Sequence, residues 1–243
     1  MNYEAKPNER LDDLQCGGLQ IIQRADMYRF SEDAVYLANF AKAKAGARVC
    51  DLGTGGGVIA LLLSAKTEAR EIVGVEIQAD LADMAARSAA YNGLSGRVKI
   101  LNAPMQEAHT ALGRESFDVA VCNPPYFEAA RAAPADSKER TEAGTALADS
   151  KGRPEIDGRT AARHETHVTL DEVAASAARL LKFGGRFYLI HRCERLADAF
   201  RALSAHRLEP KVLKLVKPAP NKPPLYALIE AVKGGKAGLK IEN

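Results

Sequence analysis

The chain has 243 residues, of which 47% are hydrophobic, enough to bury the core of one α/β domain. No apolar run reaches the ~18 residues that a membrane-spanning helix needs, and the first residues are polar with mixed charge, so we expect no membrane segment and a cytoplasmic protein. The four cysteines are scattered without a Cys-x-x-Cys pair, which argues against a zinc site or a disulfide framework.

The formal net charge of +3 is unevenly distributed. Between residues 179 and 240 there are fourteen Lys and Arg residues against four acids, so the remainder of the chain is net negative. This asymmetry indicates a cationic C-terminal third suited to a phosphate backbone. A solvated basic face without a partner would explain the same count.

The first 45 residues predict a hairpin followed by a helix. Two apolar-rich runs, 19–23 and 27–30, flank the polar residues 24–26. Ser31 is expected to cap a helix that extends to about Lys44, with acidic residues in its first turn, where the helix dipole favours anions. We expect this segment to pack against a larger domain formed by 46–243.

From residue 48 onward, strand and helix patterns alternate, which is typical of an α/β domain with a parallel sheet. The expected strands are 48–52, 71–76, 97–101, 117–122 and 186–191, and the expected helices are 57–66, 79–92, 170–182 and 193–205, the third closed by Gly184 and Gly185. Two further apolar runs, 211–216 and 225–232, flank a proline-rich turn and indicate an antiparallel hairpin at the sheet edge.

A glycine-rich loop, Asp51 to Gly57, follows the first of these strands and precedes an apolar helix. This order is typical of nucleotide-type binding units, because glycines let a ligand lie against bare backbone. A dinucleotide site would require glycine or alanine where Val58 stands, so a pyrophosphate clamp is not indicated. A glycine-rich helix entry without a ligand is the simpler alternative.

Polar residues end the next two strands. Glu76 follows a buried-type run, and in open α/β sheets an acid at this place accepts hydrogen bonds from ribose hydroxyls. An exposed glutamate at a strand end is also common by chance. Asn102 and Ala103 follow the strand 97–101, where an ordinary turn would look much the same.

The sequence Asn123-Pro124-Pro125-Tyr126 directly follows the strand 117–122. Each proline fixes φ near about −65° and keeps the preceding residue extended, so the Asn123 side chain and the flanking carbonyl groups are oriented in advance. Two fixed acceptors suit the two N–H donors of a planar amine, and Tyr126 can stack on a flat substrate. Taken alone, the motif could equally be a proline-rich turn with an aromatic anchor.

The segment from about 127 to 166 has no clear periodicity, and so long a loop in a compact domain is usually functional or disordered. Because it begins beside Asn-Pro-Pro-Tyr, we predict a lid or a substrate-contacting insertion. Near its end, Arg163 and His164 place a cation beside an imidazole, which could meet a phosphate or a base. An ordinary solvated helix start is the alternative.

Together, the glycine loop and Asn-Pro-Pro-Tyr resemble the class I S-adenosylmethionine-dependent methyltransferases. More narrowly, the chain resembles the bacterial family that methylates the exocyclic amine of the adenine beside the anticodon of valine tRNA. The matching blocks are 9–14, 30–35, 51–58, 75–78, 122–127, 162–165 and 191–196, although the part between 127 and 162 is longer than expected for that family. The resemblance implies a Rossmann-like α/β fold, with a mostly parallel seven-stranded sheet, an antiparallel C-terminal hairpin, and residues 1–45 packed over the cofactor site.

The resemblance also implies S-adenosyl-L-methionine as cofactor, tRNA as substrate, and no metal. The methyl group would pass in line to an amine held by Asn123 and the Pro124 carbonyl, while Tyr126 stacks on the flipped base. The implied cofactor-binding residues are Asp51 near the ammonium group, Gly53, Thr54, Gly55, Gly57, Glu76 at the ribose, Ile77, Asn102 and Ala103 at the adenine, and Asn123. Ser31 and Asp33 would close the cofactor pocket. The substrate-binding residues would be Pro125, Tyr126, Phe127, Arg163 and His164.

Two other functions remain open. Release-factor methyltransferases share Asn-Pro-Pro-Tyr and methylate a protein glutamine amide, which is also a planar amine; the basic C-terminal third favours RNA. A nucleic-acid-binding module with a vestigial cofactor site is the third possibility, and the joint presence of Asp51, Glu76 and Asn123 argues against it. The oligomeric state is left open.

Overall fold

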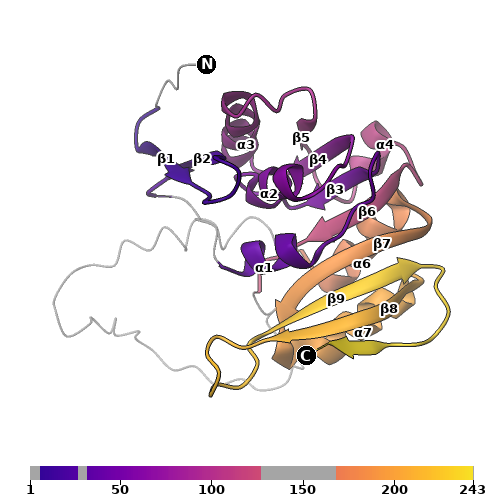
Figure 1. Cartoon of the computed structure of the whole chain (residues 1–243). Helices are drawn as coiled ribbons and strands as arrows, with labels where there is room; N and C mark the ends of the chain where they lie inside the picture. Colours follow the sequence, from indigo (N-terminus) through magenta and orange to yellow (C-terminus); the bar gives the residue numbers. More distant parts are fainter. Residues whose placement is uncertain (1–5, 27–31, 127–167, 243) are drawn as a thin grey trace, which may run out of the picture.

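The computed structural model describes residues 6–26, 32–126 and 168–242. Its centre is an eight-stranded sheet in the order β10-β8-β9-β7-β6-β3-β4-β5, and β1 and β2 form a separate small sheet (Figure 1). The strands are β1 Glu9–Asp13, β2 Gln20–Arg24, β3 Arg48–Leu52, β4 Glu71–Glu76, β5 Val98–Asn102, β6 Phe117–Cys122, β7 Leu181–Arg192, β8 Leu208–Val216, β9 Tyr226–Lys233 and β10 Lys240–Glu242. The helices are α1 Glu32–Phe40, α2 Val58–Lys66, α3 Ala79–Tyr91, α4 Ala108–Leu112, α6 Leu170–Leu180 and α7 Leu196–Ala205, the last preceded by a 3₁₀ turn at Cys193–Arg195.

Helices cover both faces of the large sheet (Figure 1). Along β3, Val49 belongs to the apolar cluster formed with α1 and α2, whereas Cys50 belongs to the cluster formed with α4, α6 and α7. Successive residues of a strand point to opposite faces, so strands covered on both sides need continuous apolar runs. Cys50 and Cys122 are fully buried, as two such positions require.

The strands β5, β4, β3, β6 and β7 run parallel, and β9 lies antiparallel between β7 and β8. This confirms the expected mostly parallel α/β sheet with an antiparallel C-terminal hairpin. The sheet has eight strands instead of seven, because β10 pairs in parallel with β8. All three residues of β10 are exposed, so no apolar pattern marks it in the sequence.

The N-terminal hairpin is not the expected pairing of 19–23 with 27–30. Strand β2 pairs antiparallel with the upstream strand β1, with Leu11 opposite Ile22. The connecting turn uses positive φ at Gln15, Gly17 and Gly18, and Glu9–Asp13 lacks the apolar alternation that would reveal a strand. Residues 27–31, including the expected cap Ser31, lie outside the described residues.

Three helix boundaries also differ from expectation. Helix α1 ends at Phe40 instead of about Lys44, and α7 begins only after a 3₁₀ turn. Helix α6 ends at Leu180, because Leu181 is already extended and enters β7 directly. Gly184 and Gly185 therefore lie within β7, whose register with β6 shifts between Phe117 and Val119. The short helix α4 was not expected at all.

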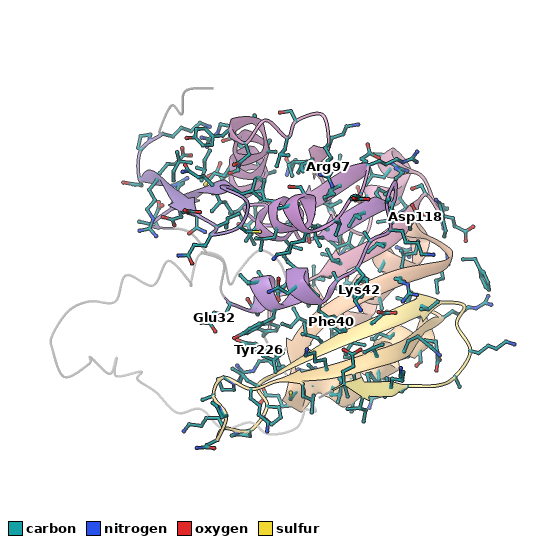
Figure 2. All side chains as sticks on the ribbon, in the orientation of Figure 1. Glu32, Phe40, Lys42, Arg97, Asp118 and Tyr226 are labelled. Carbon is teal, nitrogen blue, oxygen red and sulfur yellow. The ribbon has the colours of Figure 1, made fainter. Side chains whose placement is uncertain are left out.

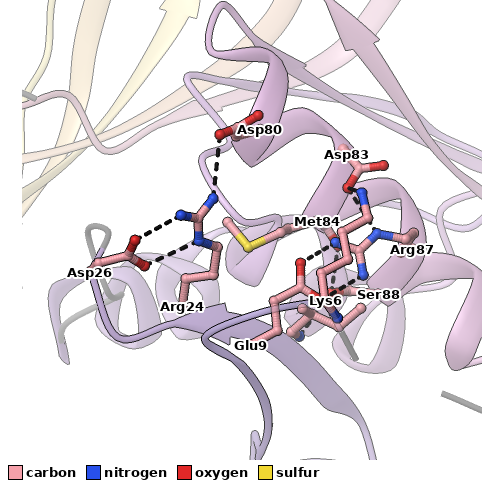
Figure 3. A network of polar contacts seen from close by, with 10 residues as sticks. Lys6, Glu9, Arg24, Asp26, Asp80, Asp83, Met84, Arg87 and Ser88 are labelled. Atoms are coloured by element: carbon pink, nitrogen blue, oxygen red, sulfur yellow. Dashed lines mark hydrogen bonds and ion pairs between the residues drawn. The ribbon is translucent and has the colours of Figure 1, made fainter. Parts of the chain in front are cut away.

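The small sheet is attached to α3 by a network of polar contacts (Figure 3). The Arg87 guanidinium pairs with the buried Glu9 carboxylate of β1 and, at 2.8 Å, with Asp83. This pairing with Arg87 lowers the pKa of Glu9. In addition, the Ile22 amide donates to the Ser88 hydroxyl at 2.9 Å. These contacts hold β2 beside the carboxyl ends of β3 and β4. Division of the chain at residue 45 stays a prediction.

Polar contacts also fix the amino-terminal ends of the central strands, and two of the residues that make them, Arg97 and Asp118, are labelled in Figure 2. Arg97, which directly precedes β5, donates from its guanidinium to the carbonyl oxygens of Ser64 in α2 and Ala69 after it, at 2.8 and 2.6 Å. Asp118 accepts from the Arg48 amide at 2.9 Å, which aligns β6 with β3. Among the described helices, none has both the length and the apolar character needed to cross a bilayer.

The close approach of β4 to the glycine loop predicts a sensitivity to substitution at Gly74. A Cβ added at Gly74 would lie 2.8 Å from Thr54 side-chain atoms and 2.9 Å from Ile100 Cδ1. We expect Gly74→Ala to lower the free energy of unfolding by about 1–3 kcal/mol, since the neighbours must shift. Urea unfolding followed by circular dichroism measures this, and Gly96→Ala is the control because nothing lies within 4 Å of its added Cβ. Equal midpoints for the two variants would contradict the prediction.

Candidate active site

A cavity of about 450 Å³ opens at the carboxyl ends of β3, β4 and β6. In open α/β sheets this edge is where ligands bind. The cavity is lined by the glycine loop from Gly53 to Gly56, by Glu76 and Ile77 after β4, and by Asn123 to Tyr126 after β6, while Ile21 to Arg24 of the small sheet form a wall. The two motifs singled out in the sequence therefore share one cavity.

The glycine loop exposes its backbone to the cavity. Gly55 has φ of 57°, in the left-handed region, and nothing lies within 4 Å of an added Cβ there. Gly57 has φ of 89° and packs closely on α3, because an added Cβ would be 3.0 Å from the Ala85 Cβ. The positive φ favours glycine at both positions, and close packing is a second reason for it at Gly57. Because no atom lies over the Cβ position of Gly55, its backbone is accessible to a ligand.

Asp51 lies beneath this loop and is not among the residues that line the cavity. Its side chain is fully buried, and its Oδ2 accepts a hydrogen bond from the Thr54 hydroxyl at 2.5 Å. Its Oδ1 has no hydrogen-bond partner among the described residues. Burial raises the pKa of Asp51 to about 7, although the Thr54 hydrogen bond acts in the opposite direction. Its contact with a ligand ammonium group stays a prediction.

Among the described residues that line the cavity, Glu76 is the acidic one. Its Oε2 accepts from the Gly55 amide at 2.8 Å, and its Oε1 accepts from the Gln78 amide at 2.9 Å. Burial raises the pKa of Glu76, while the backbone donors lower it. Each carboxylate oxygen can accept more than one hydrogen bond, so Glu76 both holds the glycine loop and offers acceptors to a ligand. Beside it, Ile77 is 48% exposed and supplies an apolar surface.

Asn102 and Ala103 mainly brace the end of β4. The Asn102 amide donates to the carbonyl oxygens of Glu76 and Ile77, at 2.8 and 3.0 Å, and the Ala103 amide donates to Glu76 O at 3.0 Å. The donors assigned to the adenine are therefore used within the protein. Ala103 lines the cavity, whereas Asn102 does not. Their contact with a cofactor base stays a prediction.

The Asn-Pro-Pro-Tyr loop forms another wall of the cavity. Pro124 is buried and Pro125 is exposed. The Tyr126 hydroxyl lies 2.7 Å from Asn123 Oδ1 and 2.7 Å from Oδ2 of Asp33 on α1. Asp33 thus reaches the Asn-Pro-Pro-Tyr loop, a contact that the sequence did not reveal.

Two aromatic residues for which the sequence predicted no role, His191 of the block 191–196 and Tyr226, support Tyr126. The His191 ring meets Tyr126 edge-on at 5.2 Å, and the Tyr226 ring lies 5.8 Å away. His191 is 5% exposed, and burial lowers its pKa to about 4, with a further contribution from Arg195. It is therefore neutral at pH 7. The position of His191 near the end of an apolar strand was a signal that could have identified it.

Several predicted residues cannot be placed. Phe127, Arg163 and His164, together with the predicted lid at 127–166, lie outside the described residues. Within the described ranges, no three His, Cys, Asp or Glu side chains are arranged to hold a metal ion.

The cavity fits S-adenosylmethionine chemically. Bare backbone at Gly55 leaves room for its amino-acid part, because no side chain there blocks the approach of a ligand. Glu76 offers acceptors for ribose hydroxyls, and the exposed Ile77 offers an apolar surface for a planar base. The described residues thus match the three parts of the molecule.

Comparisons with known proteins identify the family of the chain. A family model described as "Methyltransferase domain" matches residues 43–218. A protein from Porphyromonas gingivalis named tRNA1(Val) (adenine(37)-N6)-methyltransferase is 30% identical over 208 residues, covering 83% of this chain and 73% of the relative. A Bacteroides fragilis protein of the same name is 26% identical, covering 81% of this chain and 74% of the relative.

Solved structures show the same fold. A predicted O-methyltransferase from Agrobacterium tumefaciens has a TM-score of 0.64 at 22% identity, covering 86% of this chain and 84% of its own. Geranyl diphosphate C-methyltransferase from Streptomyces coelicolor, solved with S-adenosyl-L-homocysteine, has a TM-score of 0.57 at 15% identity, covering 82% and 74%. The chain belongs to the class I S-adenosylmethionine-dependent methyltransferases.

Proposed function

We propose that this enzyme methylates the exocyclic amine of an adenine in tRNA, in the cytoplasm, and that valine tRNA, near the anticodon, is its substrate. The observation that carries the proposal is that the glycine loop and Asn123 line one cavity. The names of the relatives, which specify adenine 37 of a valine tRNA, support the choice of acceptor.

The protein contributes binding and orientation. S-adenosylmethionine supplies a methyl group on a positively charged sulfur. Asn123 Oδ1 and the Pro124 carbonyl accept the two N–H groups of the amine, which directs the nitrogen lone pair toward the methyl group. The Tyr126 ring, held by His191 and Tyr226, stacks on the extruded base.

Basic residues around Tyr226, whose ring packs against Tyr126, support an RNA substrate over a peptide. The loop between β8 and β9 contains Lys217 and Lys222 and ends next to Tyr226, whose ring lies 5.8 Å from Tyr126. Arg192 lies 5.9 Å above the Tyr226 ring. A cation and an aromatic face beside a base pocket suit a phosphate and a neighbouring nucleotide. Methylation of a glutamine amide would not need these charges.

The chemistry and substrate are tested with total RNA from a strain that lacks this protein. We expect the wild-type enzyme and labelled cofactor to produce N6-methyladenosine in tRNA, detected by nucleoside mass spectrometry. The Asn123→Ala variant should bind the cofactor normally yet lose at least about 100-fold in methyl transfer, because the amine loses an oriented acceptor. A fully active variant would refute the role of Asn123, and methylation of release factor but not tRNA would refute the substrate.

Glu76 is expected to contribute to cofactor affinity. Glu76→Ala removes the ribose acceptors and also releases the Gly55 amide, so we expect the dissociation constant for S-adenosylmethionine to rise at least about tenfold by calorimetry. Glu71→Ala is the control, because Glu71 begins the same strand and pairs instead with Arg48 and Lys99. Unchanged affinity in Glu76→Ala would exclude the ribose role.

The two lysines predict a salt-dependent contribution to tRNA binding. In the double variant Lys217→Gln/Lys222→Gln we expect weaker tRNA binding. The slope of the logarithm of the tRNA association constant against log[salt] should decrease in magnitude by about 1 to 2, since up to two phosphate contacts are lost. Filter binding at several salt concentrations measures the slope. Lys236→Gln, at the opposite end of β9, should retain the wild-type slope. An unchanged slope in the double variant would place the RNA elsewhere.

A further inference from the structure

The Tyr126 hydroxyl lies between two acceptors but has only one hydrogen to donate. Asn123 Oδ1 and Asp33 Oδ2 are each 2.7 Å from it. A phenolic hydroxyl donates one hydrogen bond, so it cannot satisfy both oxygens fully at once. When the hydrogen points to Asn123, it occupies one lone pair of the oxygen that the proposed reaction needs for the substrate amine.

Asp33 is placed to take that hydrogen. It is 1% exposed and lies in the first turn of α1, where the helix dipole stabilises a carboxylate. Its Oδ1 accepts from the Ala34 amide at 2.7 Å, which orients Oδ2 toward Tyr126. A charged acceptor forms a stronger hydrogen bond than a neutral amide oxygen, so Asp33 competes effectively with Asn123.

The ring of Tyr126 is held while its hydroxyl hydrogen can rotate. His191 packs edge-on against the ring at 5.2 Å, and Tyr226 is tilted against it at 5.8 Å. Rotation about the C–O bond moves the hydrogen between the two acceptors without displacing the ring. The two acceptor states therefore differ in the availability of Asn123 and not in the shape of the cavity.

We propose that Asp33 is a positioning residue for methyl transfer: it accepts the Tyr126 hydroxyl hydrogen and so leaves Asn123 Oδ1 open to the acceptor amine. The proposal rests on the proposed function, because it assigns Asn123 to the amine. In this proposal Asp33 acts on the reaction through the Tyr126 hydroxyl and touches neither reacting atom.

A double-mutant cycle tests this coupling. Asp33→Leu removes one of the two described acceptors and favours the hydrogen bond to Asn123, so kcat for tRNA methylation at saturating S-adenosylmethionine should fall about tenfold or more. Asp33→Asn keeps an acceptor oxygen and should recover much of the loss. In the Tyr126→Phe background there is no hydroxyl to redirect, so Asp33→Leu should cause no further loss. Glu32→Leu, on the same turn, is the matched control.

An equal loss from Asp33→Leu in both backgrounds would overturn the proposal, because it would show that Asp33 acts independently of the hydroxyl.

A nuclear magnetic resonance measurement tests the same hydrogen bond without catalysis and without the Leu variant. In protein labelled with ζ-¹³C tyrosine, the resonance that disappears in Tyr126→Phe reports the Tyr126 hydroxyl. It should shift in Asp33→Asn and not in Glu32→Gln; an unmoved resonance would overturn the inference. A wild-type enzyme that leaves tRNA unmethylated would overturn the proposed function alone, since the resonance still reports the hydrogen bond.

Discussion

The register of the parallel strands is the constraint on which the site depends. Leu52, the last residue of β3, pairs with Val75 of β4 and with Cys122 of β6. The residues that follow these three partners are Gly53 after β3, Glu76 at the end of β4 and Asn123 after β6. All three therefore lie at the same edge of the sheet. A shift of β6 by one residue would exchange Val119 and Val121, which pack in one apolar cluster, with Ala120 and Cys122, which pack in the other, so the packing of both clusters also enforces the alignment of the site.

Two acidic residues lie buried at this carboxyl edge of the sheet. Asp51 and Glu76 are both buried, and burial raises the pKa of each. Among the described residues, the partners of these carboxylates are backbone amides and the Thr54 hydroxyl, and no Lys or Arg side chain pairs with either. Buried acceptors without a paired cation suit a positively charged ligand such as a sulfonium with an ammonium group. The same hydrogen bonds hold the glycine loop in place before a ligand binds.

The N-terminal elements complete the site from outside the central sheet. Strand β2 contributes Ile21 to Arg24 to the cavity wall, and it is held to α3 by the polar network around Arg87. Helix α1 contributes Asp33, whose carboxylate meets Tyr126. Residues that precede the first strand of the central sheet thus contribute to the cavity wall and contact the Asn-Pro-Pro-Tyr loop.

The alternation of strands and helices, the glycine loop and Asn-Pro-Pro-Tyr could be recognised from the sequence alone. Doubly covered parallel strands require continuous apolar runs, and prolines and glycines restrict or widen φ locally, so each signal lies within a few neighbouring residues. The central strands, the acid Glu76 and the family followed from these local patterns.

Only the tertiary structure decided contacts between residues far apart in the chain. Asp33 and Tyr126 are separated by 93 positions, and neither residue type indicates the other. The pairing of β1 with β2, the three exposed residues of β10, and the entry of Leu181 directly into β7 depend on what each segment packs against. Likewise, the amides of Asn102 and Ala103 bind the end of β4, because β4 and β5 lie adjacent in the folded sheet.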